Sequence, residues 1–159
     1  MSDQAARFDD QAGEKDLAGR TIHIKDTEIM VFAAYAKDGI FEDQISCIAR
    51  ITNKGERPFI LAMDANAPPH KVQSLIDELG IKAEVITPNN TEITCHQGKG
   101  SMIDFVVVKE GWESWITALQ LVEMPWKPHL AVSFCIDKPK GPMLYRTLVS
   151  PATPVLDAV

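Results

Sequence analysis

The sequence predicts an α/β fold of the α+β type, in which helices flank a mixed β-sheet. Two observations support this class. Short apolar runs with strand-like composition recur along the chain, and two segments between them carry apolar residues at helical spacing. The order is strand, strand, helix, strand, helix and then only strands, which is typical of a sheet with its helices on one face.

Length and composition fit a single globular domain. The chain has 159 residues, of which 45% are hydrophobic and 24% are charged. Residues 1–20 are polar and without periodicity, so we expect a flexible N-terminal segment there. Residues 21–137 carry the strand and helix patterns of the expected domain, and residues 138–159 are expected to form a proline-rich C-terminal segment.

The first predicted elements are a hairpin and a helix. Residues 21–25 and 28–35 are predicted strands, and the second is apolar enough to be buried on both faces. Residues 40–53 are predicted to form a helix that ends near Gly55. Its apolar side chains recur at helical spacing, at Phe41, Ile45 and Ile48.

A strand and a second helix follow. Residues 59–63 are an apolar strand, and the Pro68-Pro69 pair interrupts the chain before a helix that Gly80 closes in a left-handed conformation. That helix is marked by Val72, Leu75, Ile76 and Leu79. Strands are then predicted at residues 83–86, 92–95, 101–108, 117–123 and 130–136. Helices on one face leave the other sheet face without an obvious cover.

Charge and cysteine content narrow the classes of partner. The net charge is -6 and the pI is about 5.2, so no overall basic field draws the protein to nucleic acid or to an anionic membrane. A metal-dependent enzyme is still compatible with a phosphodiester, because the cation carries positive charge. The three single cysteines and the absence of a leader or a long apolar run predict an intracellular protein, cytoplasmic or nuclear, with no membrane partner.

Polar side chains stand at the ends or edges of five predicted strands: Tyr35, Asp64 with Asn66, Thr94, Asp104 and His129. Open α/β sheets keep their ligands at strand ends. Asp104 is the most informative, because a charge inside the apolar run SMIDFVVV needs a partner. Structural alternatives stay open for the others, since Asp64 and Asn66 are also turn formers and a lone histidine before a strand is more often structural.

These residue types suit hydrolysis of a phosphate ester. Asp64 can position and deprotonate a water, and the Asn66 amide can donate to a phosphate oxygen. His129 can stabilise the transition state if Asp104 holds its ring. The reaction also needs a divalent cation, Mg²⁺ or Mn²⁺, for which Asp64 is the candidate ligand.

Four motifs resemble, in order, the second half of the endonuclease/exonuclease/phosphatase family, and retroelement endonucleases in particular. They are AAY, FILAMDANAPP, TCHQGKGSMIDFVVV and PHLAVSF. The comparable family stretches run like VYxP, ILxGDFN, TxxxxGxSxIDYVLV and SDHxxV. The resemblance covers residues 21–137 and implies one half of a two-sheet α/β sandwich.

The resemblance also implies roles for the site residues. Asp64 would position the nucleophilic water with Asn66 beside it. Asp104 would orient His129, and His129 would stabilise the transition state. Tyr35 and Thr94 are the predicted substrate-binding residues.

The chain departs from the family pattern in three places. The family's N-terminal half, with a strand-end asparagine and a metal-binding glutamate, has no counterpart. Pro128 replaces the aspartate of Ser-Asp-His, and Met63 to Asn66 replaces GDFN. We therefore expect weak Mg²⁺ binding by the isolated chain. The uncovered sheet face is expected to pair with the missing half-domain, with a second copy or within a longer parent polypeptide.

Three other groups of residues are weaker candidates for a functional site. Cys95 and His96 with His70 and His129 fit no standard zinc spacing. The GKGS stretch lacks the spacing of a phosphate loop and predicts a hairpin turn. The tryptophans at 112, 115 and 126 suit a base-stacking surface or, more often, a core or interface.

Two classes of function remain. The first is a partial metal-dependent phosphodiester hydrolase of the endonuclease kind, weak or inactive alone, with nucleic acid or another phosphoester as substrate. A phosphatase or phosphodiesterase acting on a soluble ester would share its residues. The second class is a catalytically degenerate binding or scaffold domain that dimerises or pairs through its exposed sheet face.

Overall fold

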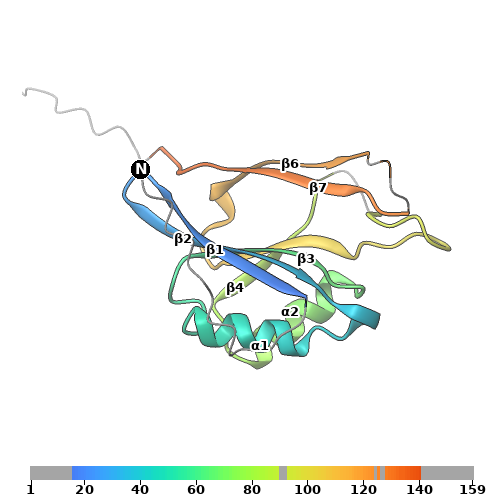
Figure 1. The fold of residues 1–159 in the computed structure, drawn as a ribbon, viewed down its shortest axis with the longest axis horizontal. Coiled ribbons are helices and arrows are strands. Elements are labelled where there is room, and N and C mark those ends of the chain that lie inside the picture. Colours follow the sequence, from blue (N-terminus) through green and yellow to red (C-terminus); the bar gives the residue numbers. More distant parts are fainter. Residues whose placement is uncertain (1–15, 90–92, 124, 126–127, 141–159) are drawn as a thin grey trace, which may run out of the picture.

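The computed structural model describes residues 16–89, 93–123, 125 and 128–140. Their strands form two sheets (Figure 1). The larger sheet has five strands in the order β1-β2-β3-β5-β4, and β6 pairs with β7 in the smaller one. The predicted α+β class is confirmed, although the last two strands leave the mixed sheet and form a layer of their own.

The predicted N-terminal hairpin is confirmed, with a longer first strand. β1 (Leu17–Ile24) runs antiparallel to β2 (Thr27–Tyr35). β1 begins at Leu17 rather than at Thr21, because its first residues already pair with the end of β2, as in the Leu17 to Ala34 pair. The segment LAGR has little strand propensity of its own, so the partner strand imposes this extension.

Two helices cover one face of the five-stranded sheet (Figure 1). α1 (Glu42–Ile51) and α2 (Pro69–Glu78) confirm both predicted helices with shifted bounds. Pro69 is the first residue of α2 rather than part of a break before it, because the first helical N–H groups need no intrahelical partner. Neither helix has the length and apolar character needed to cross a bilayer within the described residues.

The centre of the sheet is β3 (Phe59–Asp64), which runs parallel to β2 and antiparallel to β5 (Asp104–Lys109). Both faces of β3 are buried, which explains its unbroken apolar sequence. β4 (Ala83–Ile86) completes the sheet beside β5.

The loop before β5 differs from the prediction in its strand content. β5 begins at Asp104 rather than at residue 101. Residue 92, the first of the predicted strand 92–95, lies outside the described part of the chain. Among the remaining residues of that strand, Cys95 forms isolated bridges with Ser101 and His129. The predicted turn is present, closed by the Gly100 N–H donating to the Gln97 carbonyl.

A second layer covers part of the other sheet face. β6 (Ile116–Val122) and β7 (Ala131–Ile136) cross that face as an antiparallel pair (Figure 1). Their inner side packs on the fully buried residues Ile29, Ile60, Val106 and Val108. The rings of Trp112 and Trp115 stack 4.2 Å apart and pack into the same cluster, which favours the core role for these two tryptophans. Trp126 lies outside the described residues.

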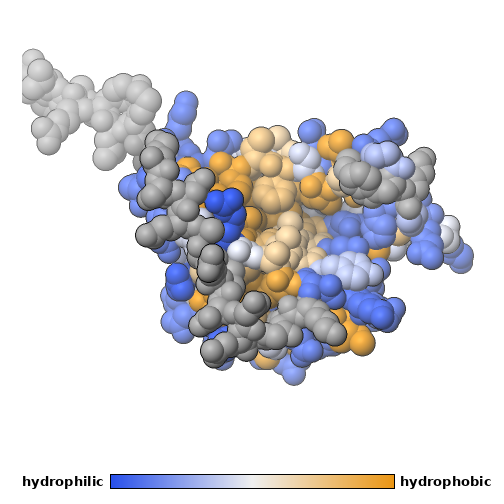
Figure 2. All heavy atoms as spheres, in the orientation of Figure 1, coloured by the Kyte–Doolittle hydropathy of each residue, from blue (hydrophilic) through white to orange (hydrophobic). Residues whose placement is uncertain are grey.

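The described residues leave one strip of this face uncovered. Ala18, Ala33 and Ala62 are consecutive register partners across β1, β2 and β3, and we call them the alanine row. Ala18 and Ala33 are exposed. Figure 2 shows apolar side chains reaching the surface between the two sheets. The cover that the sequence left unassigned is therefore supplied only in part by β6 and β7.

Candidate functional site

The sheet places three of the predicted site residues in one row, next to the alanine row. Tyr35 at the end of β2 is the register partner of Asp64 at the end of β3. Asp64 is in turn the register partner of Asp104, the first residue of β5. The ends of β2 and β3 and the start of β5 lie at one edge, because β3 is parallel to β2 and antiparallel to β5.

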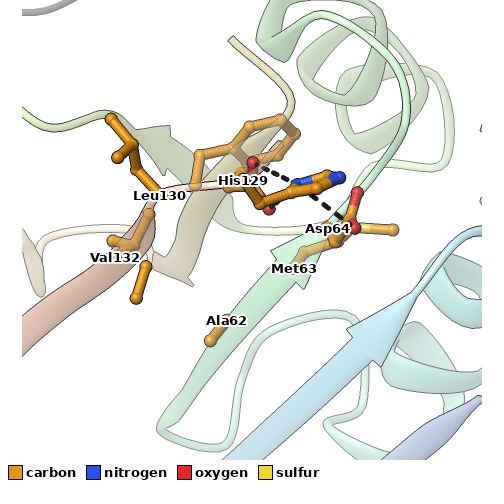
Figure 3. A pocket seen from close by; sticks show the side chains of 9 residues that line it. Ala62, Met63, Asp64, His129, Leu130 and Val132 are labelled. Atoms are coloured by element: carbon orange, nitrogen blue, oxygen red, sulfur yellow. Dashed lines mark hydrogen bonds and ion pairs between the residues drawn. The ribbon is translucent and has the colours of Figure 1, made fainter. Parts of the chain in front are cut away.

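His129 joins this row from the second layer. Its Nδ1 lies 3.2 Å from Asp104 Oδ2 and 3.8 Å from Asp64 Oδ2 (Figure 3). Backbone hydrogen bonds hold its segment in place, because Leu130 N–H donates to Thr94 O and His96 N–H donates to Pro128 O. The contact expected between Asp104 and His129 is therefore present, and Asp64 shares it.

The environment of Asp64 disfavours its charged form. Its side chain is 23% exposed, and that of Asp104 is 15% exposed. Burial raises the pKa of the Asp64 carboxyl, and the neighbouring Asp104 charge raises it further. The Asn66 N–H, which donates to Asp64 Oδ1 at 3.2 Å, and the His129 ring act in the opposite direction. A raised pKa brings a carboxylate closer to the range useful for a general base.

Asn66 shapes the loop after β3. Its backbone has a left-handed φ of 46°, a conformation that asparagine tolerates better than most residues. Its side-chain Nδ2 donates to the Ala36 carbonyl at 3.1 Å, which ties this loop to the end of β2. The structure thus gives the Asn66 amide a backbone partner, and the predicted donation to a phosphate stays a prediction.

Thr94 and Tyr35 occupy very different places. Thr94 is 0% exposed, and its Oγ1 accepts hydrogen bonds from Ile103 N–H and Asp104 N–H, both at 3.0 Å. Tyr35 is 46% exposed at the edge of the site row. The Thr94 hydroxyl therefore fixes the backbone that carries Asp104, and substrate contact by either residue stays a prediction.

A pocket of about 420 Å³ opens beside these residues (Figure 3). It is lined by Ala62, Met63, Asp64, Asp104, Phe105, His129, Leu130, Ala131 and Val132. One end is polar and the walls are apolar, and those walls come from β3 and from the start of β7. Sequence reasoning did not identify the apolar wall, because it forms only when the second layer crosses the sheet.

Cys95 is a further neighbour that the sequence did not assign to the site. Its Sγ lies 3.7 Å from His129 Nε2, and the residue is 2% exposed. The adjacent His96 and the distant His70 are exposed. Within the described residues the zinc set of Cys95, His96, His70 and His129 is not assembled.

The donor set fits a divalent cation. Asp64, Asp104 and His129 each offer one ligand atom, and these atoms lie within 4.8 Å of one another. Two carboxylates and one imidazole are common ligands of divalent metals. Asp64, the predicted metal ligand, therefore has two further candidate ligands beside it.

The comparisons with known proteins show a similarity of fold. No protein-family model matches the sequence, and no curated protein sequence is significantly similar to it. Solved structures are similar at low sequence identity. The endonuclease domain of TRAS1, a telomere-specific non-LTR retrotransposon, superimposes with a TM-score of 0.63 and 19% identity, over 82% of this chain and 67% of that chain.

Two bacterial proteins are similar as well. The cytolethal distending toxin of Actinobacillus actinomycetemcomitans has a TM-score of 0.55 and 17% identity, over 76% of this chain and 53% of the toxin chain. The 3'-5' exonuclease of Neisseria meningitidis has a TM-score of 0.53 and 12% identity, over 85% and 69% of the two chains. The described chain thus has a fold similar to that of endonuclease/exonuclease/phosphatase proteins, of which it spans between about half and two thirds.

Proposed function

We propose that the chain is a partial, metal-dependent phosphodiester hydrolase domain of the endonuclease kind, weak or inactive alone. The observation that carries this proposal is the cluster of Asp64, Asp104 and His129 at the polar end of a pocket. Carboxylates and an imidazole in contact are the groups that activate water and balance charge in hydrolysis.

The roles follow from the contacts. Asp64, positioned by the Asn66 N–H, is the candidate base for a water in the pocket. Asp104 orients the His129 ring, which lines the pocket beside Asp64. A divalent cation, Mg²⁺ or Mn²⁺, would neutralise charge on the phosphate. Tyr35, exposed beside Asp64, is the candidate contact for the phosphate or its sugar.

The proposal also covers the substrate and the cellular compartment. Two of the similar proteins are described as an endonuclease and a 3'-5' exonuclease, which supports nucleic acid as the first substrate to test. A soluble phosphoester uses the same chemistry and is the second substrate. We place the domain inside the cell, in the cytoplasm or the nucleus, in accord with its single free cysteines.

Partial coverage supports the expectation of weak activity alone. The alanine row is open to solvent, and the similar structures contain chain that this protein does not match. We propose that full activity needs this face to be covered by a missing half-domain, by a second copy or by the rest of a longer polypeptide.

Cleavage of supercoiled plasmid by the purified chain tests the proposal. We expect slow nicking with Mg²⁺ or Mn²⁺ that disappears with chelator and with His129→Ala, and survives in the control His70→Ala, whose side chain is exposed on α2. Light scattering on the same samples records the oligomeric state. A folded protein that cleaves neither DNA nor soluble phosphodiesters, alone or with its open face covered, would contradict the enzyme proposal.

Pro128 and the alanine row favour a second function, a binding or scaffold domain without catalysis. Proline offers no side-chain ligand beside His129, and the open apolar row is suited to protein contact. The two functions are separable with Asp64→Ala combined with His129→Ala. If neither the wild-type chain nor the double variant hydrolyses the substrates and both bind a partner equally well, the scaffold is supported. If the wild-type chain hydrolyses them and the folded double variant does not, the enzyme is supported.

A further inference from the structure

Both ring nitrogens of His129 have a protein neighbour. Nδ1 lies 3.2 Å from Asp104 Oδ2 and 3.8 Å from Asp64 Oδ2. Nε2 lies 3.7 Å from Sγ of Cys95, which is 2% exposed. If Nδ1–H donates a hydrogen bond to Asp104, only Nε2 is left to contact a phosphate. Nε2, however, lies next to the buried Cys95 thiol.

The two tautomers of His129 make different use of these neighbours. With the proton on Nδ1, the ring donates to Asp104 and leaves its Nε2 lone pair beside Cys95. With the proton on Nε2, the ring donates to the Cys95 sulfur and aims its Nδ1 lone pair at two carboxylates, an arrangement that a cation between them would stabilise. A metal-bound histidine characteristically donates its other N–H to a neighbouring acceptor in this way.

The distances fit a shared ion. Metal–ligand bonds of about 2.1 Å place adjacent ligand atoms roughly 3.0–3.5 Å apart. The nitrogen to oxygen separations of 3.2 and 3.8 Å are close to this range, and all three ligand atoms lie within 4.8 Å of one another. Asp64 and Asp104 are held by adjacent strands and His129 by its bridge to Cys95, so the geometry is set by the backbone.

We propose that Asp64, Asp104 and His129 Nδ1 bind one divalent first-row transition ion, such as Mn²⁺ or Zn²⁺, in preference to Mg²⁺. Mg²⁺ is held mainly by oxygen ligands and keeps several waters, whereas imidazole suits the transition ions. Cys95 then acts as a positioning residue, whose sulfur accepts a hydrogen bond from the Nε2–H of His129. The inference rests on the proposed function and names its cation. With the ion bound, Asp104 and His129 are both ligands, and Cys95 rather than Asp104 orients the ring. The test needs no hydrolysis.

Metal titration of the full chain without substrate tests the site. Co²⁺ binding is followed by its visible absorption and Mn²⁺ binding by electron paramagnetic resonance, each with Mg²⁺ as competitor. We expect one ion per chain, bound at least about tenfold more tightly than Mg²⁺, and weakening of about tenfold or more in His129→Ala and in Asp104→Asn. His96→Ala, which removes an exposed histidine next to Cys95, is the matched control and should bind normally.

Variants of Cys95 test its role. Cys95→Ala removes the acceptor and should weaken Co²⁺ binding about 10-fold to 100-fold, while circular dichroism confirms that the variant is folded. An intense sulfur-to-cobalt absorption band would overturn the positioning role, because it would make Cys95 a ligand. Equal affinity for Mg²⁺ and Mn²⁺, or binding that depends on His96 instead of His129, would overturn the proposed site.

The same titration separates this inference from the proposed function. Ion binding at the predicted residues, without any cleavage by the chain alone or with its open face covered, would leave the inference standing and contradict the hydrolase. Cleavage supported by Mg²⁺, in a protein that does not bind transition ions at His129, would support the hydrolase and overturn the inference.

Discussion

Asp64 and Asp104 face each other across the antiparallel strands β3 and β5 as direct register partners. Like charges in this arrangement oppose folding. Burial and the charge of Asp104 raise the pKa of Asp64 as a result. The fold therefore carries an electrostatic cost at the place where the pocket opens, which is common where a site is built for chemistry rather than for stability.

Asp64→Asn should stabilise the fold at neutral pH. The pKa of Asp64 in the folded chain lies above its ordinary value of 3.8. The protonated carboxyl therefore contributes fully to stability below pH 3.8, and this contribution is lost as the pH rises through the folded pKa, because the unfolded chain ionises more readily. The amide removes this loss and keeps an oxygen for the Asn66 N–H. We expect a gain of about 0.2–1 kcal/mol in unfolding free energy at pH 7.

The pH dependence of that gain is the sharper part of the test. Urea unfolding between pH 4 and pH 7 should show the gain shrinking as the pH falls. Asp77→Asn on α2 is the matched control, because Asp77 also accepts one hydrogen bond, from Gln73, that an amide oxygen can keep. A gain that is the same at both ends of the pH range, or equal in the two variants, would contradict the assigned cause.

The sequence placed Tyr35, Asp64 and Asp104 at the ends or edges of predicted strands, and the structure makes these three residues register partners. Tyr35 ends β2, Asp64 ends the parallel strand β3, and Asp104 begins the antiparallel strand β5, so the three residues lie at one edge of the sheet. The charge of Asp104 in an apolar strand signalled a partner, and His129 is in contact with it. These features depend on local pattern, which a single sequence contains.

Other features depend on contacts between segments far apart in the chain. The Thr94 hydroxyl and the Cys95 thiol are placed by the bridge to residues 128–130, and no local pattern reports that bridge. The pocket wall and the separate layer of β6 and β7 likewise exist only after the hairpin crosses the sheet. Their apolar alternation predicts strands but does not say which sheet they join.

Thr94 should contribute to stability mainly through its hydroxyl. Thr94→Val keeps the shape but removes the acceptor of two backbone N–H groups, those of Ile103 and Asp104. Leaving buried donors unpaired costs about 1–3 kcal/mol. Thr94→Ser keeps the acceptor and loses one methyl group, at a cost of about 1 kcal/mol. Denaturant unfolding of the two variants measures the difference, and a larger loss for Thr94→Ser than for Thr94→Val would show that the methyl group matters more than the hydroxyl.

Asn66 should tolerate glycine better than alanine. Its φ of 46° is strained by about 1–2 kcal/mol for a residue with a β-carbon and without a compensating side-chain contact. Both substitutions lose the hydrogen bond to the Ala36 carbonyl, so their difference isolates the backbone conformation. We expect Asn66→Ala to be less stable than Asn66→Gly by about 1 kcal/mol in urea unfolding. The opposite order would mean that the loop relaxes out of the left-handed conformation.

The alanine row should mediate association of the isolated chain. Ala33 is exposed in the middle of this row, between Ala18 and Ala62, on a sheet face that the second layer leaves open. Burying such a surface against another copy is favourable because apolar area leaves water. Light scattering should therefore show a mass that increases with concentration for the wild-type chain, and a monomer for Ala33→Arg, in which a charge replaces a methyl group at the contact.

Ser74→Arg is the matched control for this association, because Ser74 is exposed on α2, on the opposite face of the sheet. It adds the same charge and should leave association unchanged. If Ala33→Arg loses association but unfolds at the same urea concentration as the wild-type chain, the row is a contact surface and not part of the monomer core. A wild-type chain that stays monomeric at every concentration would exclude a second copy as the cover. The missing half-domain and the longer polypeptide would then remain as candidates, and adding either in trans should protect Ala33→Cys from thiol reagents.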